Sequence, residues 1–299
     1  MNEEQKGTLA VVSAAIGYGF LAVLIKLALE AGAGVVPLAT WRFAIAGVIV
    51  WLLLAARRRP APPRGAWPKL AGLGAIYAVN ALAFIAALQW IPAATATLVF
   101  YTYPVVVVLL AGLFLGERFT RHKLVGMALA VLGCGLTAGA GAAGGHPAGI
   151  ALVLLAMSSL SVYIVLSRRV MVALPGQGSA AVMVSATAIV FALVAVPTGS
   201  YELGGGDRAA GLVALLALVS TALPITLFIV GLKRIGAGRA AIYSTIEPVV
   251  TVIAAAVLLD ERIASIQYVG GVLILAGVLW LRTERPLPPS EEPTPLDAP

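Results

Sequence analysis

The feature that most constrains this chain is a series of ten long apolar runs separated by short polar segments. A helix needs about 20 mainly apolar residues to cross the roughly 30 Å hydrocarbon core of a bilayer. Because lipid offers no hydrogen-bond partners, a crossing segment must satisfy its own backbone groups, which favours helices. The sequence therefore predicts an all-α polytopic membrane protein with crossings at 7–29, 37–56, 68–90, 93–115, 123–141, 148–167, 179–198, 209–232, 237–258 and 264–281.

The composition agrees with a lipid surrounding. Of the 299 residues, 61% are hydrophobic and 11% are charged, whereas soluble domains have roughly 45–50% apolar and about 25% charged residues. The first apolar run, 7–29, is longer than the core of a signal peptide, which has about 7–15 residues. We therefore expect this run to be an uncleaved first crossing.

The basic residues are distributed unevenly between the two sides. Cytoplasmic loops of membrane proteins carry an excess of lysine and arginine. With a cytoplasmic N-terminus, Arg208 and Arg262 lie outside, whereas sixteen basic residues lie inside, namely Lys6, Arg57, Arg58, Arg59, Arg64, Lys69, Arg118, Arg121, Lys123, Arg168, Arg169, Lys233, Arg234, Arg239, Arg282 and Arg285. Both termini are therefore expected in the cytoplasm, and the net charge of +7 reflects orientation and not nucleic-acid binding.

The chain contains an internal repeat at a constant offset of 144 residues. The pairs that carry it include Pro104 and Pro248, Leu115 and Leu259, Gly126 and Gly270, and Gly133 and Gly277. Each half has five crossings, so the second half enters the membrane from the opposite side. The sequence predicts two inverted five-helix repeats, 1–141 and 148–283, an architecture found in many secondary transporters. The segment 284–299 is rich in proline and glutamate, and we expect it to be a disordered cytoplasmic tail.

Prolines interrupt three predicted crossings. Pro104 and Pro248 each lie about 11 residues into their crossing, roughly 16 Å deep and close to mid-membrane. Proline donates no amide hydrogen, which frees the carbonyls of Phe100 and Ser244, and it kinks the helix. Pro224 is a third candidate kink. Paired interruptions at matching positions point to a substrate site, although a kink that only aids packing is the alternative.

Polar and aromatic side chains near these interruptions are candidate substrate ligands. Tyr103 and Glu247 occupy equivalent places in the two repeats. An ionisable group near mid-membrane usually faces a cavity or a partner, so Glu247 is either a functional group or a hydrogen-bond partner for a neighbouring helix. The other candidates are Tyr77, Asn80, Phe84, Tyr101, Ser161, Tyr163, Thr221 and Ser244, although serine and threonine in membrane helices often bond to a neighbouring backbone instead.

Two cations lie near the outer ends of the first two crossings. Lys26 and Arg42 are candidates for attracting a carboxylate from the outer side. The alternative is that their charged groups reach the lipid headgroups, with Glu30 as a surface partner for Lys26. The pairs Glu117–Arg118 and Glu261–Arg262 are expected to be structural helix-end pairs.

The ends of the two repeats carry a family resemblance. The segments Tyr103–Pro104 to Leu115–Arg118 and Glu247–Pro248 to Leu259–Arg262, the opening 17–20 and the segment 41–43 resemble the EamA-type ten-helix permeases of the drug/metabolite transporter superfamily. The resemblance implies an exporter in a bacterial inner membrane. It also implies a central cavity lined by crossings 1, 3, 4, 6, 8 and 9.

These observations predict a secondary transporter that exports a small metabolite, an amino acid or related compound, by alternating access, with proton coupling as a further option. The alternative is a passive channel or a membrane scaffold. An intramembrane enzyme is disfavoured, since no histidine or aspartate lies within a crossing. The single cysteine, Cys134, and the separated His122 and His146 give no basis for a metal site. No cofactor and no obligatory protein partner are expected.

Overall fold

A computed structural model gives the structure of residues 1–115, 120–142, 146–171 and 173–283. The predicted disordered tail, 284–299, and the predicted pair Glu117–Arg118 lie outside the described residues.

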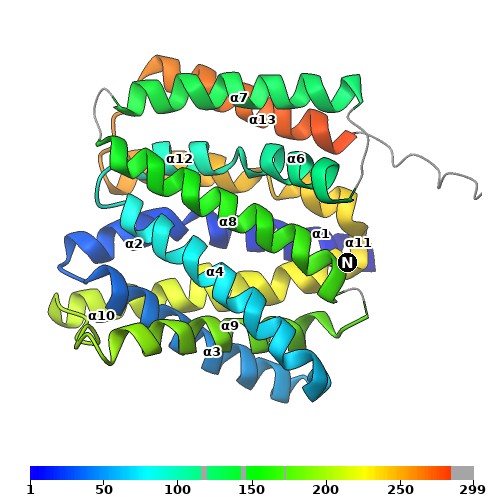
Figure 1. The fold of residues 1–299 in the computed structure, drawn as a ribbon, viewed down its shortest axis with the longest axis vertical. Coiled ribbons are helices and arrows are strands. Elements are labelled where there is room, and N and C mark those ends of the chain that lie inside the picture. The colour runs from blue at the N-terminus through cyan, green and yellow to red at the C-terminus, as the bar shows by residue number, and fades with distance from the viewer. Residues whose placement is uncertain (116–119, 143–145, 172, 284–299) are drawn as a thin grey trace, which may run out of the picture.

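The described chain is helical and crosses the bundle ten times, as the apolar runs predict (Figure 1). Seven helical runs are long and apolar enough to span a membrane, and the apolar parts of α12 and α13 are shorter. A 3₁₀ turn, η1 (Arg64–Ala66), precedes α4. The crossings are α1–α2 (Glu3–Gly19 and Leu21–Glu30), α3 (Val35–Ala56), α4 (Trp67–Ala87), α5–α6 (Ala93–Phe100 and Tyr103–Leu115), α7 (Arg121–Ala142), α8 (Pro147–Met171), α9 (Gly176–Ala195), α10–η2–α11 (Gly206–Ala217, Leu218–Ala222 and Leu223–Tyr243), α12 (Ile246–Leu258) and α13 (Ser265–Thr283).

The connection between the eighth and ninth crossings lies within α11. Gly236 has a left-handed φ of 79° inside this helix. Glycine adopts this conformation without a Cβ clash, so the chain reverses there, and the last residues of α11 begin the ninth crossing together with α12.

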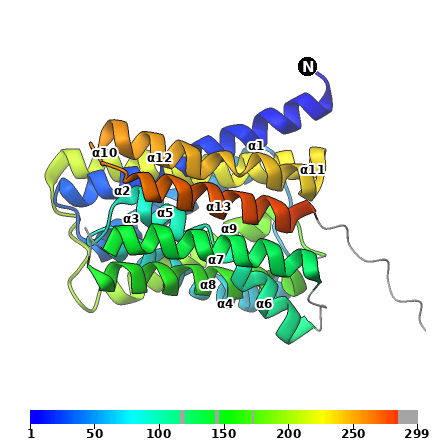
Figure 2. The ribbon, with the colours of Figure 1, turned by 90° about the horizontal axis from the view of Figure 1, so that it is seen from above.

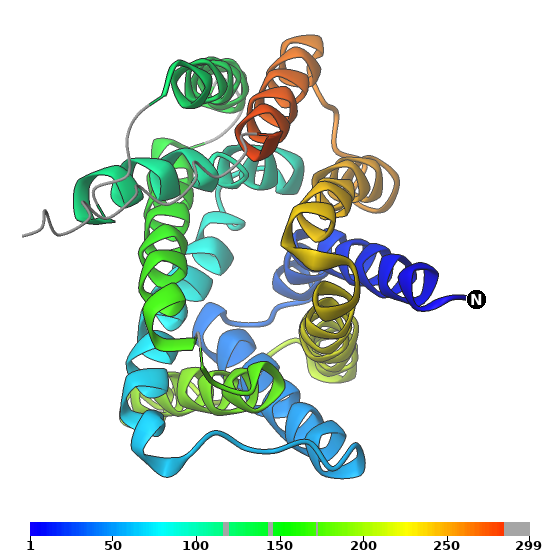
Figure 3. The same ribbon diagram turned by 90° about the vertical axis from the view of Figure 1, so that its right-hand side faces the viewer.

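The helices form a ring when the molecule is viewed along the bundle, with α1, α11 and α12 on one side and α4 and α8 on the other (Figure 3). The helices α7 and α13 lie side by side at one edge, and α3 and α9 lie at the opposite edge (Figure 1). The N-terminus and the end of α13 lie at the same end of the bundle, which we call the terminal end (Figures 1 and 2). We call the opposite end the far end.

Glycine contacts between α7 and α13 show how the two repeats are related. A Cβ on Gly277 would lie 2.6 Å from the carbonyl oxygen of Gly126, and a Cβ on Gly270 would lie 2.7 Å from that of Gly133. Gly126 therefore contacts Gly277, the repeat counterpart of Gly133, and Gly133 contacts Gly270, the repeat counterpart of Gly126. Such reciprocal contacts are those of a two-fold symmetric interface. The order of the contacts makes the helices antiparallel, which confirms the prediction of inverted repeats.

A second pair of equivalent contacts lies elsewhere in the bundle. Helix α1 of the first repeat packs on α11 of the second, and equivalently α8 of the second repeat packs on α4 of the first. A Cβ on Gly7 would lie 2.7 Å from Cγ2 of Ile235, and a Cβ on Gly149 would lie 2.6 Å from Cγ2 of Ile91. Small residues allow membrane helices to approach closely. In both helix pairs a glycine of one helix therefore packs against an isoleucine, Ile235 within α11 or Ile91 just after α4.

Four crossings are interrupted near their middle. The first breaks at Phe20, between α1 and α2. The fourth breaks at Tyr101–Thr102 and the ninth at Ser244–Thr245, each shortly before Pro104 or Pro248. The eighth contains the π-helical turn η2, which directly precedes α11 and its Pro224. The interruptions place irregular backbone in the interior of the bundle, where it can contribute to a site.

Candidate functional site

A cavity of about 320 Å³ lies inside the ring of helices. All six crossings that the family resemblance implies contribute to it, and Arg42 adds the second crossing. The volume falls within the roughly 300–1,000 Å³ typical of small-molecule sites. Its lining consists of Ala15, Tyr18, Leu21, Ala22, Arg42, Tyr77, Asn80, Ala81, Phe84, Thr97, Phe100, Tyr101, Tyr103, Leu160, Tyr163, Ile164, Phe228, Ser244, Glu247 and Thr251.

Eight of the ten candidate ligands line this cavity, and two do not. Those on the lining are Tyr77, Asn80, Phe84, Tyr101, Tyr103, Tyr163, Ser244 and Glu247. Ser161 is fully buried and donates hydrogen bonds to the carbonyls of Met157 at 2.7 Å and Tyr103 at 3.1 Å. Thr221 is also buried and donates to the carbonyl of Leu216 at 3.2 Å. Both hydroxyls bond to backbone, which is the alternative that the sequence left open.

Aromatic rings make up much of the wall. The rings of Tyr77 and Tyr163 pack edge to face with centroids 5.4 Å apart. The rings of Phe84 and Phe100 also line the cavity, and their centroids lie 5.0 Å apart. Aromatic faces and phenol groups suit a ligand that has both apolar and polar parts.

Arg42 lies in the cavity wall rather than at the membrane surface. Only 4% of its surface is exposed, although the sequence placed it near an outer end. Its Nε donates a 3.0 Å hydrogen bond to Oγ1 of Thr221, and its guanidinium carbon lies 4.7 Å from the centre of the Phe43 ring. The alternative in which Arg42 reaches the lipid headgroups is therefore wrong, because the side chain points inward from α3.

The cavity links the broken crossings of the two repeats. The phenol of Tyr101 donates to the carbonyl of Ser244 at 3.3 Å, which is the carbonyl that Pro248 leaves without its helical amide donor. Similarly, the hydroxyl of Thr251 donates at 2.7 Å to the carbonyl of Gly19, at the break of the first crossing. The interruptions of crossings 1, 4 and 9 are therefore held next to one another around the cavity.

Lys26 helps to close the far end of the bundle. Its Nζ lies 3.4 Å from Oε1 of Glu261 and donates to the carbonyl of Ile91 at 3.1 Å. Glu261 also accepts the backbone amides of Ala93 at 2.6 Å and Ala94 at 3.0 Å, at the start of α5. The partner of Lys26 is thus Glu261 in the other repeat, and not the surface residue Glu30.

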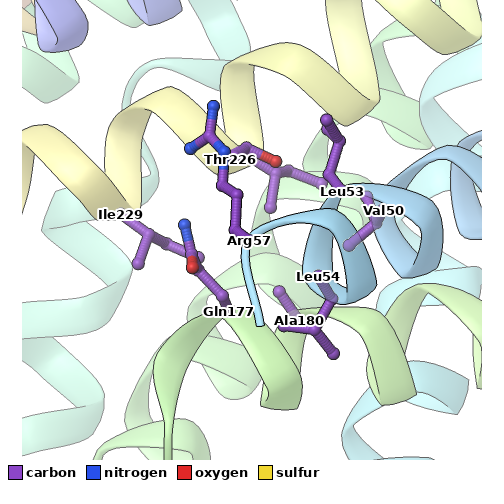
Figure 4. A pocket seen from close by; sticks show the side chains of 9 residues that line it. Val50, Leu53, Leu54, Arg57, Gln177, Ala180, Thr226 and Ile229 are labelled. Atoms are coloured by element: carbon purple, nitrogen blue, oxygen red, sulfur yellow. The ribbon is translucent and has the colours of Figure 1, made fainter. Parts of the chain in front are cut away.

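Ion pairs at the terminal end join neighbouring helices. Nε of Arg234 in α11 lies 3.1 Å from Glu3 in α1, and Arg239 pairs with Glu4. A small pocket at this end lies between α3, α9 and α11 and includes Arg57, Gln177 and Thr226 (Figure 4). Its volume of about 10 Å³ is close to that needed for one water molecule, so it is too small for a metabolite.

Several lining residues were not among the sequence candidates. Those with polar or aromatic side chains are Tyr18, Thr97, Phe100, Phe228 and Thr251. Tyr18 belongs to the opening segment 17–20 that carries part of the family resemblance, so this motif was the available signal. No comparable pattern distinguishes the others, because their faces are decided by how the broken helices pack.

The model of the EamA-like transporter family matches the chain twice, at residues 5–139 and 147–283. The chain belongs to the EamA-like transporter family. This family is part of the drug/metabolite transporter superfamily, so this EamA-like protein is a multi-pass membrane protein with a transporter role.

Individual relatives agree with this assignment. Two uncharacterized transporters of Archaeoglobus fulgidus are similar to this EamA-like transporter, one 26% identical over 81% of the chain and 87% of the relative, the other 30% identical over 70% and 74%. The uncharacterized transporter YcbK of Bacillus subtilis is 45% identical, over 20% of the chain and 19% of its own length. A crystal structure of a protein 23% identical in sequence has the same fold, with a TM-score of 0.65 over 92% of this chain and 96% of that one.

The described part of this EamA-like transporter has no group of three histidine, cysteine, aspartate or glutamate side chains placed to hold a metal ion. The charged groups of the cavity lining are Arg42 and Glu247. A guanidinium suits the binding of anionic groups on a ligand, and a carboxyl group suits the binding of cationic groups or the transfer of a proton.

Proposed function

We propose that this protein is a secondary transporter that exports a small metabolite, an amino acid or related compound, by alternating access. The observation that carries the proposal is the position of the cavity, which lies between the two inverted repeats and beside the interruptions of crossings 1, 4 and 9. Rocking of one repeat against the other around such a site exposes it alternately to the two sides.

The contacts at the two ends support a direction of loading. At the far end, Lys26 and Glu261 join α2 to the segment between α12 and α13 and to the start of α5. At the terminal end, among the described residues, the pairs Arg234–Glu3 and Arg239–Glu4 join α11 to its neighbour α1. We infer a state that is closed at the far end. With the terminal end in the cytoplasm of a bacterial inner membrane, substrate loads from inside, as an exporter requires.

Glu247 is the candidate for coupling. Burial disfavours the charged form of a carboxyl group, so a glutamate that is exposed alternately to the two sides can release a proton inward and bind another from outside. That cycle couples export of the substrate to entry of protons. In the alternative role, Glu247 binds a cationic group of the substrate and carries no proton.

Proteoliposomes test transport and separate the two roles. The purified transporter is reconstituted with each of the twenty L-amino acids inside and the same labelled compound outside, and exchange is measured with and without a pH gradient. A carrier exchanges label, whereas a scaffold does not. A passive channel does not concentrate label against its gradient during counterflow. Absence of exchange for the whole panel contradicts the proposed amino acid export.

The variant Glu247→Gln keeps the shape of the side chain and removes its proton exchange. A coupling role predicts that the variant loses transport driven by the pH gradient and keeps exchange without a gradient. A ligand role predicts loss of both. If the folded variant transports normally under both conditions, Glu247 has neither role.

A further inference from the structure

We propose that Arg42 is an anion site that binds a carboxylate of the transported substrate, and that Thr221 positions it. This inference rests on the proposed transport function and names the chemical group that the cavity recognises.

The guanidinium of Arg42 is fixed on one edge and on one face. Nε donates to Oγ1 of Thr221 at 3.0 Å. One face lies against the ring of Phe43, with 4.7 Å from the guanidinium carbon to the ring centre. Phe43 is itself fully buried and stacks on Phe191, with ring centroids 5.6 Å apart. The orientation of Arg42 is therefore set before any ligand binds, which reduces the entropy cost of binding.

The other edge of Arg42 is available to the cavity. Arg42 belongs to the lining, and within the described ranges neither of its Nη groups has a hydrogen-bond acceptor in the protein. Glu247 lies on the same lining, but the two residues do not form an ion pair with each other. A cation in the membrane interior is costly unless it faces water or an anion. An anionic ligand in the cavity would therefore stabilise the charge of Arg42.

A carboxylate is the group that this edge fits best. Guanidinium binds carboxylates through two parallel N–H···O bonds, and these are among the strongest hydrogen bonds in proteins. With Nε engaged by Thr221, the two Nη groups remain to donate. The phenols of Tyr18 and Tyr77 line the same cavity as Arg42, so further donors are at hand for a bound anion.

The helix that carries Thr221 explains why this threonine can reach Arg42. Leu218–Ala222 forms the π-helical turn η2, and the Thr221 hydroxyl donates to the carbonyl of Leu216, five residues earlier. That bond leaves the oxygen lone pairs free to accept from Arg42. Short π-helical turns are rare and occur frequently at functional sites, and this one holds a buried hydroxyl against the cavity arginine.

Binding measurements on the purified full-length transporter in detergent test the site directly. The unfolding temperature is recorded with each of the twenty L-amino acids, and every stabilising compound is compared with its carboxamide and its N-acetyl derivative. We expect the free carboxylate to be required, so the carboxamide should bind at least about tenfold more weakly, equivalent to about 1.4 kcal/mol.

Variants then assign the effect to Arg42. Arg42→Gln should weaken binding of the carboxylate compounds by about tenfold or more, while the carboxamides should bind the variant and the wild type equally. Thr221→Val keeps the side-chain shape and removes the acceptor of Nε, so it should weaken binding by a smaller factor, about 2- to 10-fold. Arg208→Gln, a change at an exposed site in the first turn of α10, is the matched control and should change nothing.

The outcomes separate this site from the proposed transport. If carboxylates bind through Arg42 but are not exchanged in proteoliposomes, the site is right and the transport proposal is wrong. If exchange occurs and is unaffected by Arg42→Gln, transport stands and the site is wrong. The site is also wrong if none of the twenty amino acids stabilises the wild type, or if carboxamides bind as tightly as the acids. Should Arg42→Gln fail to fold, Thr221→Val decides in its place.

Discussion

Lys26 and Glu261 form an ion pair across the two repeats, with Nζ and Oε1 3.4 Å apart. The side chains are 21% and 9% exposed. Glu261 accepts two backbone amides at the start of α5 as well, where a carboxylate also complements the helix dipole. The pair therefore belongs to a network that holds the far end closed.

The first prediction concerns this network. Glu261→Gln should lower the free energy of unfolding by about 1.5–3 kcal/mol, because hydrogen bonds to a buried charged group are lost. Thermal unfolding in detergent measures the effect. The control is Glu4→Gln, which removes an exposed ion pair with Arg239 and should cost less than about 1 kcal/mol. Equal effects of the two variants would show that Glu261 does not hold the far end.

A second prediction concerns the contact between α7 and α13. A Cβ on Gly133 would collide with the carbonyl of Gly270, so Gly133→Ala should destabilise the protein by about 1–3 kcal/mol through overpacking. Gly135 lies two residues further along the same helix, and a Cβ there meets nothing within 4 Å. Gly135→Ala is therefore expected to leave the unfolding temperature unchanged or slightly raised. The close helix contact is disproved if Gly133→Ala is equally neutral.

The third prediction concerns the bond between the two broken crossings. Tyr101→Phe removes the hydrogen bond from the phenol to the carbonyl of Ser244, with an expected loss of about 0.5–1.5 kcal/mol of stability. The rate of exchange in proteoliposomes should also fall for the folded variant, because the hydrogen bond joins the two helix breaks beside the cavity. Tyr268→Phe, at an exposed position on α13, is the control. Unchanged exchange and stability in Tyr101→Phe would show that the bond has no role.

A fourth prediction concerns orientation in the membrane. In a Cys134→Ser background, Glu202→Cys places a thiol in the exposed segment between α9 and α10 at the far end, and Gly65→Cys places one in η1 at the terminal end. An impermeant maleimide should label the first variant in intact cells and the second only after the membrane is opened. The reverse pattern would place both termini outside and contradict the charge bias of the loops.

The sequence was sufficient for the fold class because its signals are local and periodic. Runs of about 20 apolar residues fix the crossings. The offset of 144 residues between Gly126 and Gly270 and between Gly133 and Gly277 predicts the inverted repeat, and the contacts of these glycines show it. Pro104 and Pro248 likewise mark the crossings that break, since a missing amide and a ring clash act on the nearest turn of helix.

The sequence did not predict which groups the individual side chains contact. Lys26 is one turn from Glu30 in sequence, yet it pairs with Glu261 of the other repeat. For Arg42 the lipid headgroups were one alternative, yet its side chain lies in the cavity lining and is bonded to Thr221. Ser161 and Thr221 were candidate ligands, yet their hydroxyls bond to backbone. The contacts of Lys26 and Arg42 join segments that are distant in sequence, whereas Ser161 and Thr221 bond to carbonyls four and five residues earlier in the chain.

What the sequence determined by itself is the number of crossings, their interruption and the two-fold relation of the halves, because hydrophobic length, proline and a constant offset act along the chain. What only the tertiary structure decided is which faces of the broken helices turn inward. Those faces depend on glycine contacts between distant crossings, on the π-helical turn before Pro224 and on a buried hydrogen bond from Arg42 to Thr221, 179 residues away. Such contacts are selected by packing in three dimensions, where residues distant in sequence compete for the same interior space.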